Sequence, residues 1–293
     1  MHRDHPLMPF LVTLAGVGML SLMDAYMKGA SLAIGAYSAA WLRSAVGVAM
    51  IAPFWLARGG KWPQPPALRL HLLRGTVSAF MALSFFYSLT KLPIAEAIAL
   101  SFIAPLIALY LAAVLLGERI RRQAIFASVL GFAGTLVIVG GKLGREQTTP
   151  EMWLGLAALL FSALLYAWNF ILIRQQSQLA GPTEVATFHS GVSAALLGVL
   201  APWFLVLPDT EAAIQIGLSA ALTVAAAMGL AWAYARAEAQ ALVPVEYSGF
   251  LWAALFGWLF FRETVTLPTL AGTALIVLGC WIAARMPTKQ SAV

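Results

Sequence analysis

The sequence has few charged residues and one cysteine, and each shortage excludes a class of protein. Charged residues make up 10% of the 293 residues, whereas an ordinary soluble domain has about 25%. Hydrophobic residues make up 61%, which is more apolar surface than a soluble chain of this length could bury, so the expected solvent is a lipid bilayer. Cys280 has no second cysteine with which to form an intramolecular disulfide, and its apolar surroundings favour a buried thiol.

The motifs of enzymes and nucleic-acid-binding proteins are also missing. The chain contains no Walker A loop, no HExxH pair and no Gly-x-Ser-x-Gly elbow. Only four histidines occur, and His2 and His5 lie in the N-terminal tail, so no metal site is expected. The net charge of +6 comes from basic residues between apolar runs rather than from one patch, so nucleic acid is not an expected partner. We therefore expect neither an enzyme nor a cofactor.

Ten apolar segments are long enough to cross the hydrocarbon layer, which takes roughly 20 residues. The first reads as a full span rather than a cleaved signal peptide. The connections are short and leave no room for a soluble domain. The predicted spans are Met8–Lys28, Ala36–Ala57, Leu70–Thr90, Ile94–Leu116, Gln123–Gly140, Met152–Ile173, Thr183–Leu207, Ala212–Ala235, Gln240–Phe261 and Thr266–Arg285.

The distribution of lysine and arginine predicts the orientation of these spans. If the N-terminus is cytoplasmic, the cytoplasmic connections and termini have 12 basic residues and the outer connections have five. The positive-inside rule therefore predicts a multi-pass protein of a bacterial-type cytoplasmic (inner) membrane with both termini in the cytoplasm.

The chain consists of two related halves, residues 1–145 and 146–293. In Leu89–Val139, and again about 145 residues later, an apolar run ends in a glutamate (Glu118, Glu263) and a polar turn leads to a second apolar run. Five spans per half is an odd number, so the second half must enter the membrane upside down. Three arginines follow Glu118, whereas the three residues after Glu263 are uncharged. This pattern predicts inverted repeats, an architecture of secondary transporters with the substrate near the midplane.

Two motifs resemble the EamA branch of the drug/metabolite transporter superfamily: IAPLIALYLAAVLLGERI (Ile103–Ile120) and EYSGFLWAALFGWLFFRET (Glu246–Thr264). The second copy lacks the proline that Pro105 supplies in the first, and Arg262 replaces the usual glycine before the glutamate. The resemblance covers nearly the whole chain and is nearest to amino-acid exporters of the aromatic and broad-specificity type. It implies an all-α fold of ten helices around a central cavity, with spans 5 and 10 peripheral, that works by alternating access.

Five ionisable side chains lie within the predicted spans, where the cost of burying a charge usually indicates function or pairing. Asp24 and Arg43 are expected at similar depth towards the outer surface, and His189 and Glu246 at similar depth towards the inner surface. Arg43 and His189 are also equivalent in the repeat, at an offset of 146. The fifth, Glu96, is expected within about one turn of the outer surface. We hypothesise that the outer pair and the inner pair each contribute to a gate or to substrate binding.

Each of these residues also has a structural interpretation. Asp24 could pair with Lys28 one turn later in the same helix. Arg43 could extend its charged end to the membrane surface, and His189 could be a packing residue. Glu118 is expected to offset the arginines that follow it rather than to bind a substrate.

Aromatic residues form a second group of candidates, because flat apolar walls suit an organic solute better than a bare ion. Nine lie in the spans expected to line the cavity, and about a third of them should face it, because tryptophan and tyrosine also favour membrane interfaces. From this group and the polar neighbours, the candidate substrate-binding residues are Tyr87, Trp168, Asn169, Tyr234, Tyr247, Ser248 and Trp252.

The residues and the resemblance together favour a secondary transporter that exports small organic metabolites, above all amino acids, since a zwitterion needs both an anionic and a cationic partner. One alternative keeps the carrier fold but changes the cargo to cationic drugs, sugars or nucleotide derivatives. A second is a membrane protein that transports nothing, such as an intramembrane enzyme or an assembly subunit. The direction of net flux, the coupling ion (a proton among the candidates) and the oligomeric state are left open by the sequence.

The predicted topology can be tested by cysteine labelling. A cysteine at Thr148 should react with a membrane-impermeant reagent added outside intact cells, and one at Gln64 should not, because the two positions lie in connections on opposite sides. The reverse labelling pattern would invert the orientation.

Overall fold

The computed structural model describes residues 7–116, 122–143, 149–176, 178–234, 245 and 247–284, and its regular structure is helical throughout these residues. The helices are α1 (Met8–Ile34), α2 (Ala36–Ala57), α3 (Pro65–Leu89), α4 (Ile94–Ser101), α5 (Ala104–Leu116), α6 (Arg122–Leu143), α7 (Pro150–Gln176), α8 (Pro182–Gly198), α9 (Ala201–Phe204), α10 (Thr210–Tyr234), α12 (Gly249–Phe261) and α13 (Leu267–Ala284). The all-α fold class is therefore confirmed for the described part of the chain.

Among these residues, five helices are long and apolar enough to cross a membrane. They are α1, α2, α3, and the parts of α7 and α10 that span Pro150–Ile173 and Thr210–Leu230. Each of the ten predicted segments contains a helix, but several of these helices are short, so the number of ten spans stays a prediction. Two segments expected as single helices are divided: 94–116 into α4 and α5, and 183–207 into α8 and α9.

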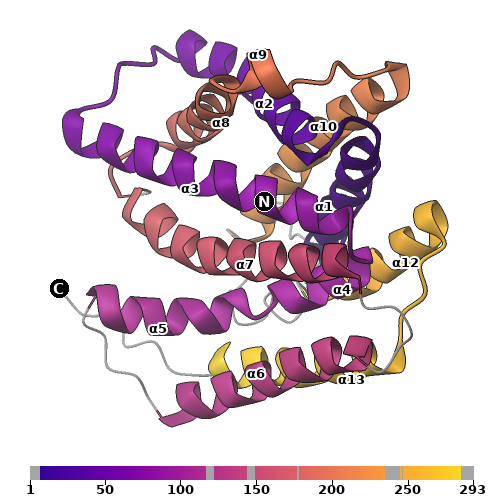
Figure 1. Cartoon of the computed structure of the whole chain (residues 1–293). Helices are drawn as coiled ribbons and strands as arrows, with labels where there is room; N and C mark the ends of the chain where they lie inside the picture. Colours follow the sequence, from indigo (N-terminus) through magenta and orange to yellow (C-terminus); the bar gives the residue numbers. More distant parts are fainter. Residues whose placement is uncertain are drawn as a thin grey trace.

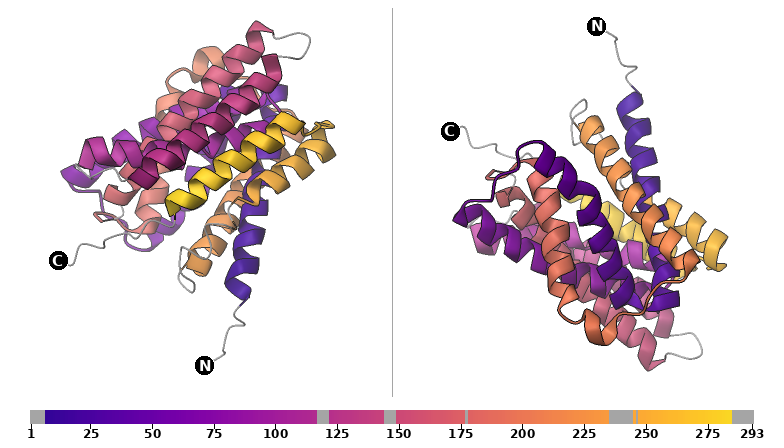
Figure 2. Two further views of the ribbon diagram at one scale, coloured as in Figure 1. Left: turned by 90° about the horizontal axis from the view of Figure 1, so that it is seen from below. Right: turned by 90° about the horizontal axis from the view of Figure 1, so that it is seen from above.

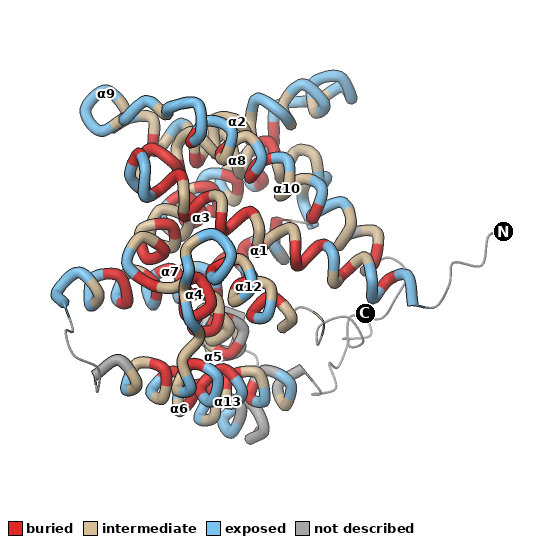
Figure 3. The backbone as a smooth tube through the Cα atoms, turned by 90° about the vertical axis from the view of Figure 1, so that its right-hand side faces the viewer, coloured by how far each residue is buried: buried red, intermediate tan, exposed pale blue. Residues whose placement is uncertain are grey.

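The helices pack mainly in pairs that take one helix from each predicted half of the chain. α1 packs along α10, α3 along α7, α2 along α8 and α6 along α13. α6 and α13 lie together along one side of the bundle (Figures 1 and 2). Buried residues run through α1, α3, α4 and α7 in the middle of the molecule (Figure 3), where Met27, Leu89 and Leu159 are fully buried.

This pairing is the one that an exchange of two repeats would produce. If the helices of residues 1–145 correspond in order to those of residues 146–293, the α1/α10 pair corresponds to the α7/α3 pair. Both pairs are observed. The α2/α8 and α6/α13 pairs then each join two equivalent helices. The pattern supports two structurally related halves, and both the inversion of the second half in the membrane and the boundary near residue 145 stay predictions.

Two glycines allow α6 and α13 to cross closely. A Cβ atom on Gly134 would lie 2.5 Å from the carbonyl oxygen of Gly272, and a Cβ on Gly272 would lie 2.5 Å from the carbonyl oxygen of Gly134. Ile138 and Ile276 pack against the two glycines. Small residues at such crossings let helix backbones approach, which matters in a bilayer because no hydrophobic effect drives helices together there.

We predict that Gly134→Ala destabilises the protein, by about 1–3 kcal/mol, because the methyl group must displace the α13 backbone. The matched control is Gly140→Ala in the same helix, where an added Cβ would meet nothing within 4 Å. Thermal unfolding in detergent should show a lower midpoint for Gly134→Ala only. An unchanged midpoint for both variants would contradict the close crossing.

Candidate functional site

Four polar side chains from both predicted halves gather in the middle of the bundle: Asp24 on α1, Arg43 on α2, His189 on α8 and Thr223 on α10. We call them the central polar cluster. Arg43 Nη2 donates a hydrogen bond to Thr223 Oγ1 at 3.3 Å. Its guanidinium group is within electrostatic reach of both Asp24 and His189, and it lies over the ring of Phe86, 5.5 Å from the centroid. The cluster therefore places a cation, an anion and an imidazole beside an aromatic wall.

Several polar groups of this cluster have no hydrogen-bond partner among the described residues. Arg43 Nε and His189 Nδ1 are buried and unpaired. Asp24 is 8% exposed, and within the described chain it forms no hydrogen bond and no ion pair. Buried polar groups in proteins almost always have partners, so each exception needs an explanation. Three exceptions in one cluster indicate a site that a ligand with both donor and acceptor groups would complete.

The predicted acid–base pairs are only partly observed. Asp24 and Arg43 attract each other electrostatically, but the ion pairs within 4 Å in the described residues are formed by other side chains. Glu246, the predicted partner of His189, lies outside the described residues, as does Glu118.

The interpretation that Asp24 pairs with Lys28 is wrong, because Lys28 has other partners. Lys28 Nζ forms an ion pair with Glu263 and donates a hydrogen bond to the carbonyl oxygen of Leu92 at 2.7 Å. It also lies 5.2 Å from the ring centroid of Phe261. Glu263 Oε2 in turn accepts a hydrogen bond from the backbone N–H of Ile94 at 2.8 Å. This Lys28–Glu263 ion pair joins the end of α1, the start of α4 and the segment after α12.

The turn after α12 explains how Glu263 reaches this position. Arg262 has a φ of 54°, in the left-handed region, and its N–H and that of Glu263 bond back to the carbonyls of Trp258 and Gly257. Left-handed backbone at a helix end favours glycine, which fits the resemblance in which Arg262 replaces a glycine. Gly257 leaves room for the carboxylate, since a Cβ there would lie 2.6 Å from Glu263 Oε2. Sequence reasoning missed this role of Glu263, although its recurrence in the repeat was a signal.

A second feature is a pair of turns at equivalent positions of the two halves, each directly before a short helix, and we call these turns the helix breaks. α4 and α5 are separated by a turn at Phe102–Ile103, and α12 begins after a turn at Tyr247–Ser248, an offset of 145 residues. The rings of Phe102 and Tyr247 touch edge to face, with centroids 5.3 Å apart and planes at 87°. Interrupted helices in corresponding places of two repeats are the best pointer to a transporter's binding site.

Tyr247, Ser248 and Trp252, three of the predicted site residues, lie at this break. Ser248 Oγ is buried without a hydrogen-bond partner in the described part of the chain. Trp252 packs on Phe256 and against Gly18 of α1, where a Cβ would be only 3.1 Å from the indole ring. The break therefore faces α1, the helix that contributes Asp24.

The other predicted site residues lie elsewhere. Tyr87 on α3 and Trp168 on α7 are partly buried, and Tyr87 packs against the main apolar core. Asn169 is buried and accepts hydrogen bonds from Arg74 Nε at 3.1 Å and Ser78 Oγ at 3.4 Å, so it links α7 to α3. Tyr234 ends α10, and its side chain lies outside the described residues.

Glu96 lies in the first turn of α4, is buried within the protein with 5% exposure, and accepts a hydrogen bond from Thr269 Oγ1 of α13 at 3.4 Å, while its depth in the membrane stays a prediction. It connects α4 to α13.

A buried polar network that the sequence did not reveal joins α3, α7 and α8. Gln176 Oε1 accepts a hydrogen bond from Arg74 Nη1 at 2.6 Å, and its amide nitrogen contacts His71 Nδ1. His71 Nε2 in turn lies 2.9 Å from a carboxylate oxygen of Glu184. Because these polar groups are hydrogen-bond partners of one another, we interpret the network as a structural link between the three helices rather than a binding site.

The helical bundle, its apolar spans and the polar cluster between its halves define a membrane transporter, and the comparison with known proteins gives the family. The model of the EamA-like transporter family matches residues 7–140 and 153–285. The chain therefore belongs to the EamA-like transporter family, and we describe it as a multi-pass membrane protein.

Relatives and a solved structure agree with this assignment. The chain is 28% identical over 264 residues to the pseudopaline exporter of Pseudomonas aeruginosa (strain UCBPP-PA14), covering 89% of this chain and 90% of that protein. It is 26% identical over 272 residues to the S-adenosylmethionine uptake transporter of Rickettsia felis, covering 92% and 88%. A crystal structure with 23% identity superimposes with a TM-score of 0.61 over 94% of this chain and 96% of that chain, which shows a shared fold.

We predict that Glu263→Gln lowers the free energy of unfolding by about 3 kcal/mol, because it leaves the Lys28 ammonium buried without an anionic partner. Lys28→Met combined with Glu263→Gln should recover a large part of this loss, since no buried charge then stays unpaired. Thermal unfolding of the wild type, both single variants and the double variant forms a double-mutant cycle. Glu151→Gln, at an exposed glutamate, is the control. Additive effects in the cycle would show that the ion pair contributes nothing.

Proposed function

We propose that this protein is a secondary transporter that exports amino acids, neutral and aromatic ones included, by alternating access. The observation that supports this most is the central polar cluster, where unpaired groups of opposite charge meet between the two halves. An α-amino acid offers a carboxylate and an ammonium group within a few ångströms of each other. In this proposal the carboxylate binds Arg43 and the ammonium group binds Asp24.

The chemistry of each residue fits that assignment. A guanidinium group binds a carboxylate through two parallel hydrogen bonds, and the unpaired Nε of Arg43 is one available donor. The buried carboxylate of Asp24 gains a cationic partner, which offsets the cost of burying its charge. Phe86, beneath the Arg43 guanidinium, supplies an apolar surface for a side chain.

The relatives support a small organic cargo but not one direction of flux. One is named as an exporter of pseudopaline and another as an uptake transporter for S-adenosylmethionine, a methionine derivative. Export of amino acids by this chain is therefore our proposal and not a property of the family.

In this mechanism, the Lys28–Glu263 ion pair keeps the outer side of the bundle closed. It joins α1, α4 and the segment after α12 at the end of the bundle that the charge distribution predicts to face outside. We propose that the pair holds that side closed and breaks when the site opens outward. A bias of 1.4 kcal/mol changes the ratio of two states tenfold, so one partly buried ion pair is sufficient to set the resting state.

The experiment is transport by the purified protein in sealed proteoliposomes, using twenty labelled amino acids with and without a proton gradient. Neutral amino acids should move, and Asp24→Asn or Arg43→Gln should each reduce the rate by about tenfold or more, because each removes one charged contact with the substrate. Arg69→Gln, at an exposed arginine of α3, should leave the rate within about twofold. If no amino acid moves while a quaternary ammonium compound or a sugar does, the proposed cargo is wrong.

A further inference from the structure

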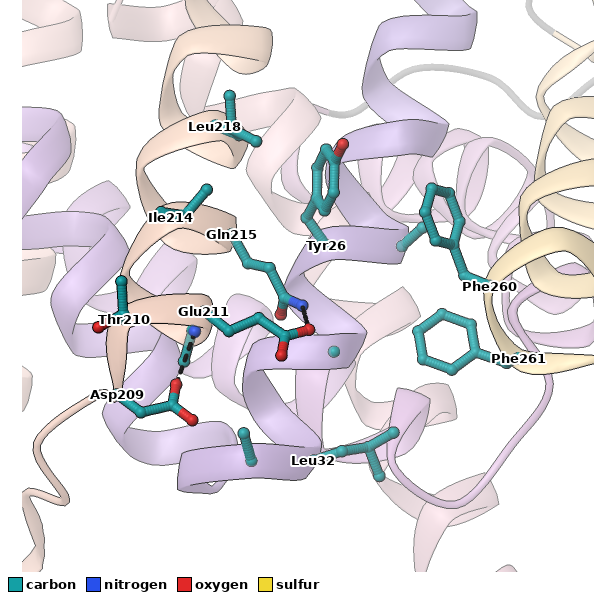
Figure 4. A pocket seen from close by; sticks show the side chains of 14 residues that line it. Tyr26, Leu32, Asp209, Thr210, Glu211, Ile214, Gln215, Leu218, Phe260 and Phe261 are labelled. Carbon is teal, nitrogen blue, oxygen red and sulfur yellow. Dashed lines mark hydrogen bonds between the residues drawn. The ribbon is translucent and has the colours of Figure 1, made fainter.

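A separate cavity of about 920 Å³ lies between α1, α10 and α12. It is placed where α1 ends, α10 begins and α12 ends, which is the end of the bundle predicted to face outside. Figure 4 shows side chains of α10 on one side of it and aromatic side chains of α1 and α12 on the other. We call it the α1/α10/α12 pocket.

This pocket is distinct from the central polar cluster. Tyr26 lines the pocket, whereas Asp24 belongs to the cluster and is absent from the pocket wall. Successive residues of an α-helix are rotated by about 100°, so Asp24 and Tyr26 point to nearly opposite faces of α1. A ligand in the pocket therefore contacts a different face of the same helix.

The α10 wall of the pocket offers hydrogen-bond acceptors and negative charge. Glu211 and Asp209 line it, and none of the residues that line it is basic. Asp209 caps α10 through a hydrogen bond from the backbone N–H of Ala212 at 2.8 Å. Glu211 Oε1 accepts a hydrogen bond from Gln215 Nε2 at 3.2 Å, which leaves Gln215 Oε1 buried without a donor among the described residues. The wall thus lacks a cationic donor.

The facing wall is aromatic. Tyr26, Phe260 and Phe261 line it, and the rings of Tyr26 and Phe260 are 5.8 Å apart between centroids. Aromatic faces attract cations within about 6 Å of the ring centroid, and Phe261 already has the Lys28 ammonium at 5.2 Å. Leu32, Ile214 and Leu218 add apolar surface, so the pocket combines acidic acceptors with room for a hydrocarbon body.

We infer that the α1/α10/α12 pocket is a second binding site, for protonated primary amines with an aromatic or aliphatic body. The ammonium group donates a hydrogen bond to the Glu211 carboxylate and a second to Gln215 Oε1, which turns from the backbone of Gly29 towards the ligand, and the body packs on Tyr26, Phe260 and Phe261. Because Gln215 Oε1 needs an N–H donor, a primary ammonium ion fits better than a quaternary one. A lipid chain would satisfy the apolar wall but would leave this oxygen unpaired.

The backbone beside the acceptor supplies a precise probe. A Cβ added at Gly29 would lie 2.6 Å from Gln215 Oε1. Gly29→Ala therefore pushes the acceptor away without changing any charge. It tests the position of Gln215, whereas Glu211→Gln tests the negative charge.

The test is isothermal titration calorimetry of the full chain in lipid nanodiscs with 2-phenylethylammonium. All variants contain Asp24→Asn and Arg43→Gln, which remove both charged groups of the central polar cluster, and each must keep the thermal midpoint of that background. Glu211→Gln and Gly29→Ala should each weaken binding by about tenfold. The matched control is Glu151→Gln, because Glu151 is likewise an exposed glutamate in the first turn of a helix, α7. It should change affinity by less than about twofold.

Three analogues of the same shape decide the ligand class. 3-Phenylpropionate should not bind, and 2-phenylethanol and 2-phenylethyl-trimethylammonium should bind more weakly than the primary amine. Equal binding of the alcohol would identify an apolar groove for lipid and overturn the proposal. So would affinity that is unchanged by both Glu211→Gln and Gly29→Ala. Because this readout is binding rather than transport, its failure would leave the proposed amino-acid export standing, and the reverse also holds.

Discussion

The hydrocarbon of a bilayer contains no water that could hydrogen-bond to a polar group, so every charge inside the protein needs a partner from the protein or from a ligand. Lys28 meets this need completely, with the Glu263 carboxylate, the Leu92 carbonyl oxygen and the Phe261 ring around one ammonium group. Arg43 meets it only in part, through Thr223, while its Nε stays unpaired. The difference separates the two roles: a fully paired charge joins helices, and a partly paired one leaves room for a ligand.

The sequence predicts the features that depend on local pattern. Apolar runs of about 20 residues predicted the helical membrane fold, and the rarity of charge within them identified Asp24, Arg43 and His189 as unusual. The structure brings Asp24 and His189 within electrostatic reach of the Arg43 guanidinium. Hydropathy predicts spanning helices because each segment lies in the same apolar solvent, whichever segments it packs against.

Partners could not be predicted in the same way, because pairing depends on tertiary packing. Asp24 and Lys28 are one helical turn apart, which made them plausible partners, yet Lys28 pairs with a residue 235 positions away. The helix breaks were also missed. The first break has a local signal that was not used, because Pro105 follows it and a proline lacks the N–H of a helix hydrogen bond. The correspondence of the two breaks is seen only in the structure, where both turns lie at the same place in the two repeats. Comparing the two halves residue by residue at the 145-residue offset would have been a better source of long-range information than any single motif.

The three features of the site share one helix. α1 contributes Asp24 to the central polar cluster and Lys28 to the ion pair, and it packs against the break before α12 through Ser21, whose hydroxyl donates to the Gly249 carbonyl oxygen at 3.3 Å. Four residues separate Asp24 from Lys28, about 6 Å along the helix axis. Under the proposed function, a substrate ammonium group at Asp24 brings a positive charge within a turn of the Lys28 ammonium. The repulsion between the two positive charges destabilises the Lys28–Glu263 ion pair when the site is occupied. A ligand shifts a conformational equilibrium only through its different affinity for the two states, and this repulsion is such a difference, since it acts in a water-excluded site while the Lys28–Glu263 pair is closed and is screened by water when the outer side opens.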